Sequence, residues 1–218
     1  MQSGFCTQVE TGAPPPFILL KKGITVDRTG VNLFPAMHYS NYLVYMNVIL
    51  QPASIEDHPT MQNMGRFYVY DMTEYMRDEE GWEIPENGLY ECIDLKKYWN
   101  DKNVFPFLIR INEELAGFVI IDKKGSHENI DFNMAQFFIL RKFKSKGIGR
   151  IVATQCFNKF NGHWEVMVMP QNKGAYKFWK RVISEYSNNQ FEEYNKTITH
   201  LSNSEKNIFK FQSRGESL

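Results

Sequence analysis

The feature that most constrains the fold is an apolar run of strand length that passes into a basic turn with two glycines. The run Phe137 to Leu140 is followed by Gly147 and Gly149, and then by residues typical of a helix. Backbone N–H groups at the start of a helix lack intrahelical partners and carry partial positive charge, so they attract anions. Glycine allows the ligand to approach closely. The stretch therefore predicts a strand, a loop and a helix that together hold a phosphate.

Basic side chains surround this turn and would strengthen its attraction for a polyanion. They are Arg141, Lys142, Lys144, Lys146 and Arg150. Two common nucleotide motifs do not fit, because the dinucleotide fingerprint needs three glycines and the phosphate-binding loop of nucleotide triphosphatases needs Gly-Lys-Ser/Thr. From the loop alone, an anion site and an ordinary solvated basic turn both remain open.

The composition indicates a globular chain with a packed core. Of the 218 residues, 43% are apolar, and 25 basic residues balance 25 acidic ones. A net charge of zero argues against nucleic acid or an anionic membrane as the main partner. The three cysteines are scattered, so we expect reduced thiols and no metal site. The longest apolar run near the N-terminus, Phe17 to Leu20, is too short for a signal peptide or a membrane span, which predicts a cytoplasmic protein.

Hydrophobic periodicity and turn residues predict the order of the elements. We expect strands at 45–51, 105–111, 115–121, 133–140, 164–169, 191–198 and 208–212, and helices at 54–75, 94–100, 147–159 and 172–186. This order predicts an α/β fold, with a mixed central sheet and helices on both faces. Residues 1–43 show no sustained periodicity and are expected to form an N-terminal extension to a domain spanning 44–218. Residues 77–91 read as an acidic loop.

Two motifs, in the right order, resemble those of the GCN5-related N-acetyltransferase (GNAT) family. The run Lys144-Ser145-Lys146-Gly147-Ile148-Gly149 is similar to the family's acetyl-CoA signature, Arg/Gln-x-x-Gly-x-Gly/Ala, with lysine at the first position. The run from Asn172 to Trp179 is similar to the family's Asn-x-x-Ala-x-x-Phe-Tyr helix start. The resemblance covers about residues 46–212 and is closest to predicted bacterial acetyltransferases of unassigned substrate. It implies the GNAT fold.

The resemblance also implies a reaction and a cosubstrate. Acetyl-CoA would donate its acetyl group to an amine of a small molecule or protein, which attacks the thioester directly, without a covalent intermediate. No metal would be required. The implied cofactor-binding residues are Phe138, Ile139, Leu140, Lys144, Ser145, Lys146, Gly147, Ile148, Gly149, Arg150, Asn172, Ala175 and Trp179.

The catalytic residues are less readily assigned. Trp179 stands where many family members carry a tyrosine that acts as general acid, and an indole cannot give up its proton at a useful pH. Gln136, where relatives carry glutamate, orients a water but accepts no proton, and Glu165 faces either the cleft or solvent. We expect Gln136, Glu165 and Trp179 at the reaction centre, with the general base and the general acid unassigned.

The acceptor amine is expected between the first helix and the acidic loop. Asp71 would hold a cationic amine, and the faces of Tyr70 and Tyr90 would add cation–π attraction, although each of the three also reads as a packing or solvated residue. A catalytically silent acyl-CoA-binding regulatory module is the alternative function, and an interaction scaffold that binds no acyl-CoA is a third. The sequence leaves monomer and homodimer open.

Overall fold

The computed structural model describes residues 47–77, 80–92, 94–198 and 204–213. These residues belong to one compact unit of the chain, Tyr42–Leu218. The N-terminal extension expected over residues 1–43 lies outside the described residues. None of the helices in the described ranges is long and apolar enough to cross a membrane.

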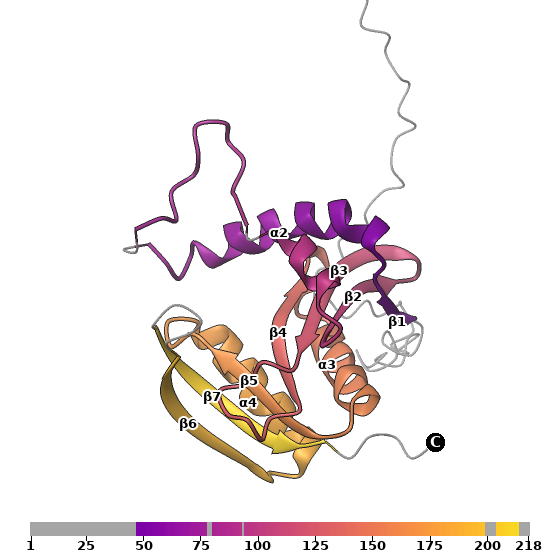
Figure 1. The fold of residues 1–218 in the computed structure, drawn as a ribbon, viewed down its shortest axis with the longest axis vertical. Coiled ribbons are helices and arrows are strands. Elements are labelled where there is room, and N and C mark those ends of the chain that lie inside the picture. Colours follow the sequence, from indigo (N-terminus) through magenta and orange to yellow (C-terminus); the bar gives the residue numbers. More distant parts are fainter. Residues whose placement is uncertain (1–46, 78–79, 93, 199–203, 214–218) are drawn as a thin grey trace, which may run out of the picture. The chain divides into compact units, whose positions relative to one another are not determined.

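The described strands form one seven-stranded mixed sheet, in the order β1-β2-β3-β4-β5-β7-β6 (Figure 1). Every neighbouring pair is antiparallel except β4 and β5, which are parallel. A parallel pair needs a crossover, and here a helix connects the two strands. The strands are β1 (Val48–Pro52), β2 (Val104–Ile111), β3 (Glu114–Asp122), β4 (Phe132–Ile139), β5 (His163–Val168), β6 (Phe191–Ile198) and β7 (Ser204–Gln212).

Helices cover both faces of the sheet, and each face has its own hydrophobic core. On one face Met61 and Met64 pack with Phe118 and other strand residues. On the opposite face Phe157 and Trp164 belong to a larger aromatic core. The helices are α2 (His58–Met72) on the first face, and α3 (Ile148–Lys159) and α4 (Lys173–Ser187) on the second; three short 3-10 turns are η1 (Ile55–Asp57), η2 (Leu95–Asn100) and η3 (Arg141–Phe143).

The predicted fold class and element order are confirmed within the described ranges. Each described strand and long helix overlaps its predicted range, and the mixed sheet carries helices on both faces. The helix predicted at 54–75 starts later, because a 3-10 turn precedes it. The carboxylate of Asp57 accepts a hydrogen bond from the backbone N–H of Ser54, 2.9 Å away, and this fixes the turn. The helix also ends at Met72, earlier than predicted.

The pairing between β4 and β5 ends after two residue pairs, the second joining Asn133 to Glu165. Directly beyond this level the register between β3 and β4 shifts, which leaves Ala135 without a direct partner on β3. Such a β-bulge bends the strand that contains the extra residue. The bend turns β4 away from β5, so a gap opens between two strands that remain joined at one end.

Gly117 allows β3 to lie close to the bent part of β4. A Cβ atom at this position would overlap the carbonyl oxygen of Phe138 and lie 3.0 Å from Cα of Ile139. Backbone atoms cannot move aside as a flexible side chain can. The path of β4 next to the gap therefore depends on the missing side chain.

We predict that Gly117→Ala lowers the free energy of unfolding by about 1–3 kcal/mol, the usual cost of overpacking. Gly174→Ala is the control, since a Cβ at this helical position meets only ordinary contacts, the nearest atom being 3.6 Å away. Alanine favours helix over glycine by about 1 kcal/mol, so the control is expected to be neutral or stabilising. Urea denaturation measures both variants, and an unchanged midpoint for Gly117→Ala would contradict the prediction.

Candidate active site

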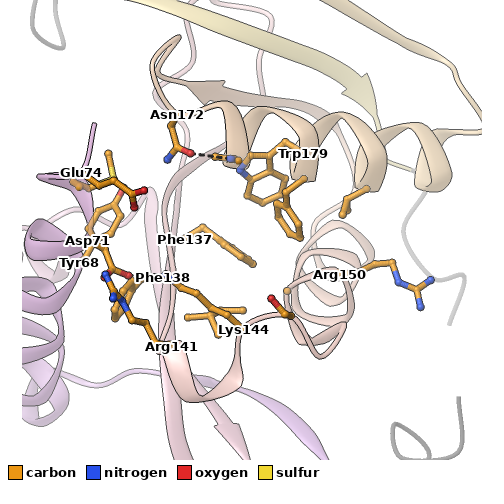
Figure 2. A pocket seen from close by; sticks show the side chains of 18 of the residues that line it. Tyr68, Asp71, Glu74, Phe137, Phe138, Arg141, Lys144, Arg150, Asn172 and Trp179 are labelled. Carbon is orange, nitrogen blue, oxygen red and sulfur yellow. Dashed lines mark hydrogen bonds and ion pairs between the residues drawn. The ribbon is translucent and has the colours of Figure 1, made fainter. Parts of the chain in front are cut away.

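A cavity of about 910 Å³ lies beside the second half of β4, beyond the level at which the pairing of β4 with β5 ends. We name it cavity A. The end of α2, the second half of β4, the glycine loop and the first turns of α4 line it. Figure 2 shows Asp71 and Arg141 on the α2 side of the cavity, Trp179 and Asn172 on the α4 side, and Phe137 between them. Cavity A therefore joins the two motifs found in the sequence.

The main chain of β4 offers hydrogen-bonding groups to cavity A. The N–H of Leu140 donates to the carbonyl of Ala116 on β3, at 2.8 Å. Main-chain groups of successive strand residues point to opposite sides in the plane of a sheet, so those of Ile139 and Phe137 point toward β5. The ladder with β5 has already ended at this level. The main-chain N–H and C=O groups of Phe137 and Ile139 are thus directed into the gap between β4 and β5.

The glycine loop presents a set of N–H groups at the other end of cavity A. Gly147 is the N-cap of α3, with a left-handed φ of 78°, and Ser145 also has a positive φ of 61°. The first intrahelical bond there is donated by Ile151 to the carbonyl of Gly147. The three N–H groups before Ile151 have no such intrahelical partner, and N–H groups of this kind at a helix start are suited to hold an anion.

Asp71 lies beside this loop and pairs with two of its cations. Its carboxylate accepts from Nε of Arg141 at 2.8 Å and from Nζ of Lys144 at 2.6 Å. The side chain of Asp71 is 15% exposed, whereas those of Arg141 and Lys144 are 67% and 46% exposed. Hydrogen bonding to Asp71 raises the pKa of Arg141 above its ordinary value. Asp71 thus lines cavity A as a carboxylate that is paired with two cations of the chain, and its role toward an amine stays a prediction.

The start of α4 forms the opposite wall. The side chain of Asn172 accepts a hydrogen bond from the N–H of Ala175 at 2.8 Å, which caps the helix. Trp179 is 6% exposed, and its ring centroid lies 4.9 Å from that of Phe137. Both Asn172 and Trp179 line cavity A. Their packing and capping contacts show that these residues also stabilise the fold.

The structure brings most of the predicted cofactor-binding residues together around cavity A. Three do not line it. Leu140 packs against both cores, Ile148 is fully buried, and the ammonium group of Lys146 lies over the ring of Phe143 at 5.9 Å. Those that line the cavity are Phe138, Ile139, Lys144, Ser145, Gly147, Gly149, Arg150, Asn172, Ala175 and Trp179.

A second cavity of about 610 Å³ lies on the α2 face of the sheet. We name it cavity B. Its walls come from α2, the acidic loop, the end of β5 and the start of β7, and they combine apolar with charged side chains. Gln136, Trp82, Glu80, Glu205 and Lys206 are among the lining residues. The acidic loop therefore contributes to a cavity, although the two loop residues that line it, Glu80 and Trp82, were not among the predicted site residues.

Two of the predicted acceptor residues lie outside both cavities. The rings of Tyr70 and Tyr90 contact each other, with centroids 5.9 Å apart, and Tyr70 is 53% exposed. The guanidinium of Arg141 lies 5.6 Å from the ring centroid of Tyr70, so the cation over this ring belongs to the chain itself. The helical spacing in the sequence could not reveal these contacts. It indicates on which face of the helix a residue lies, but not which distant residues it contacts.

Gln136 and Glu165 have different surroundings. Gln136 lines cavity B and its amide bonds to the phenol of Tyr98; burial raises the pKa of this phenol and the bond to Gln136 opposes the shift. Glu165 is fully buried and lines neither cavity. Its carboxylate accepts from the N–H and the hydroxyl of Ser126, at 2.9 and 2.6 Å. Glu165 thus holds the loop between β3 and β4, and its predicted place at the reaction centre stays a prediction.

Tyr68 and Met72 line both cavities. The sequence placed Tyr68 on the apolar stripe of its helix, together with Met61 and Met64, and this pattern predicts a core residue. Tyr68 does pack against Phe118 and Phe138. Only the position of the gap reveals that the same side chain also lies where the two cavities meet.

Comparison with protein families gives a match to the model described as the acetyltransferase (GNAT) family, over residues 69–183. The matched segment is more than half of the 218-residue chain. It runs from the second half of α2 into α4 and so includes β4, the glycine loop and both motifs. The sequence matches none of the curated proteins with which it was compared.

Solved structures of low sequence identity share the fold. An acetyltransferase from Thermus thermophilus is 14% identical, with a TM-score of 0.55, over 76% of this chain and 97% of the other. The aminoglycoside acetyltransferase AAC(6')-Ib, in complex with coenzyme A, is 12% identical, with a TM-score of 0.51, over 76% of this chain and 95% of the other. At such identities the likeness concerns the fold.

We predict that Asp71→Asn strengthens the binding of inorganic pyrophosphate and of coenzyme A by about threefold to tenfold. The carboxylate of Asp71 competes with an incoming phosphate for Arg141 and Lys144. The expected gain in affinity is small, because each ion pair with an exposed cation is weak. Calorimetry at low and at physiological salt measures the affinity, and the gain is expected to shrink as salt is added. Weaker binding by Asp71→Asn would instead show that the carboxylate positions the two cations.

Proposed function

Because the chain belongs to the acetyltransferase (GNAT) family and is thereby an acetyl-CoA-dependent N-acetyltransferase, we propose that cavity A holds acetyl-CoA and cavity B holds the acceptor amine. The amine attacks the thioester directly where the cavities meet. The observation that carries this proposal is the gap between β4 and β5, which links the anion-binding loop at one end to a second, chemically different cavity at the other.

The pyrophosphate of coenzyme A would bind at the start of α3. Backbone N–H groups of the loop and the side chain of Lys144 supply positive charge there, and Arg150 and Arg181 also line cavity A. Lysine serves a phosphate as a point charge, so its replacement of arginine at the first signature position retains the attraction. On binding, the phosphate would share Lys144 with Asp71.

The pantetheine arm of the cosubstrate carries amide groups and is narrow and extended. Main-chain groups of Phe137 and Ile139 point into the gap, so they would bond these amides much as a further strand would. Phe178 and Trp179 provide an apolar wall on the α4 side. This arrangement directs the thioester along β4, toward the Tyr68 and Met72 wall that cavity A shares with cavity B.

An amine in cavity B would reach the thioester from the α2 face. The carboxylates of Glu80 and Glu205 line this cavity and would attract a cationic amine, while Trp82 offers an aromatic face. Attack by the deprotonated amine places negative charge on the carbonyl oxygen. A main-chain N–H directed into the gap would stabilise that charge, because preorganised donors cost no rearrangement during the reaction.

Two measurements test the proposal. Calorimetry with coenzyme A reports cavity A, and release of coenzyme A from acetyl-CoA in the presence of a panel of small polyamines, amino sugars and lysine-containing peptides reports transfer. Micromolar binding together with turnover of at least one amine is expected. Binding without turnover of any amine would favour the catalytically silent acyl-CoA-binding module, and absence of binding would overturn the proposal.

We predict that Lys144→Ala weakens coenzyme A binding by about threefold to thirtyfold, because a charge-assisted contact to phosphate is lost. The matched control is Lys142→Ala, from the same loop. Lys142 does not line cavity A, and its ammonium group pairs with Glu114 at 2.7 Å. Calorimetry at two salt concentrations measures both variants. An equal loss of affinity in the two variants would indicate a diffuse field and not a contact at Lys144.

A further inference from the structure

Among the residues that the structure describes, Tyr68 is the one that both lines the two cavities and carries an exchangeable proton on its side chain. Only Met72 shares this double position among the described lining residues, and a thioether has no proton to give. If acetyl-CoA and an amine occupy cavities A and B, the wall between the reacting groups includes the Tyr68 ring. A role for Tyr68 in the reaction rests on that proposed function.

The ring of Tyr68 is held from beneath by two phenylalanines of the sheet. Its centroid lies 6.3 Å from that of Phe118, with the planes nearly perpendicular, and 5.6 Å from that of Phe138. Phe138 lies between the two β4 residues whose main-chain groups point into the gap. Aromatic pairs of this kind fix a ring at modest cost in entropy. Tyr68 is therefore positioned next to the strand along which the thioester would lie.

The hydroxyl of Tyr68 is available to a ligand. It makes no hydrogen bond to any residue in the described ranges of the chain, whereas the phenols of Tyr98 and Tyr176 bond to Gln136 and Glu193. Burial raises the pKa of Tyr68 to about 12. The group is consequently a neutral O–H donor throughout the neutral range, and on this half-buried side chain the donor is free to bond to a ligand.

A donor of this kind would stabilise the departing thiolate. Trp179 lies on the opposite wall of cavity A, and its indole N–H cannot be transferred at a useful pH. Asn172 uses its side-chain oxygen to cap α4. The charged residues nearest to the loop, Arg141 and Lys144, are engaged with Asp71.

We propose that the hydroxyl of Tyr68 bonds to the sulfur of coenzyme A and relays a proton to it from the acceptor nitrogen. The amine nitrogen forms its bond to the carbonyl carbon, and the bond from that carbon to sulfur then breaks, leaving its electron pair on sulfur. The phenolic proton passes to sulfur as the phenolic oxygen receives the proton released by nitrogen. Tyr68 begins and ends neutral, and the products are an amide and a thiol.

The first test needs no acceptor. Coenzyme A is bound to the protein, and the pKa of its thiol is measured from the ultraviolet absorbance of the thiolate. A hydroxyl that bonds to sulfur favours the charged form, so the pKa of the bound thiol is expected to be lower by about one unit in the native protein than in Tyr68→Phe. The charged side chains of the two cavities are the same in both proteins, so a difference between the two thiol pKa values reports the Tyr68 hydroxyl alone.

Tyr68→Phe keeps the ring that packs on Phe118 and Phe138, and the affinity for coenzyme A is expected to remain within about twofold. The control is Tyr186→Phe, which removes a phenol from the α4 face, where the ring packs against Phe157 and Phe211. It should leave the pKa of the bound thiol unchanged. Equal thiol pKa values in the native protein and Tyr68→Phe would overturn the inference while leaving the proposed function intact.

The second test uses the amine of the panel that gives the highest turnover. Tyr68→Phe is expected to lower kcat by about 100-fold, the scale of general acid and base catalysis, with the KM for acetyl-CoA unchanged. A solvent deuterium isotope effect on kcat is expected to change in the variant, which a purely structural role would not predict. Unchanged kcat would overturn the inference. Failure of the native protein to bind coenzyme A would overturn the proposed function and this inference together.

Discussion

The site depends on the early end of the β4 and β5 pairing. Two parallel strands that continued side by side would satisfy each other's main-chain groups and leave no room between them. The bulge at Ala135 prevents this, because it bends β4 just beyond the pair formed by Asn133 and Glu165. The unpaired main chain would be unfavourable if it were buried without partners. A ligand with amide groups, as proposed for cavity A, would supply the missing partners of this main chain.

The surrounding elements maintain this opening. Gly117 lets β3 follow β4 closely at the level of Phe138, and Glu165 fixes β5 near its start through hydrogen bonds to Ser126. On the two faces, α2 and α4 bring their side chains to the edges of the gap. The carboxylate of Asp71 on α2 bonds to Arg141 and Lys144 of the loop that follows β4, and this links the first face of the sheet to the glycine loop. The geometry of the site thus depends on contacts from several strands and helices and not on β4 and the glycine loop alone.

The sequence was sufficient for the elements, their order and the loop, because these depend on local periodicity, glycine conformation and two motifs with fixed spacing. It was insufficient for long-range partners. Asp71 was correctly placed off the apolar stripe of α2, but its pairing with Arg141 and Lys144 joins residues about 70 positions apart. Glu165 alternates in a strand and read as facing either cleft or solvent, whereas it is buried against Ser126. Tyr68 fits the core pattern of its helix, and this pattern gives no sign that its side chain also lines both cavities.

The gap also limits which molecules can enter it. Because β4 and β5 are paired only up to Asn133 and Glu165, the space between the two strands narrows toward this pair. A thin, flexible chain fits a narrowing space more readily than a rigid ring system does. If acetyl-CoA binds in cavity A as proposed, this taper would also limit the length of the acyl group. Each added methylene would extend toward the α2 face, into space that the acceptor would need.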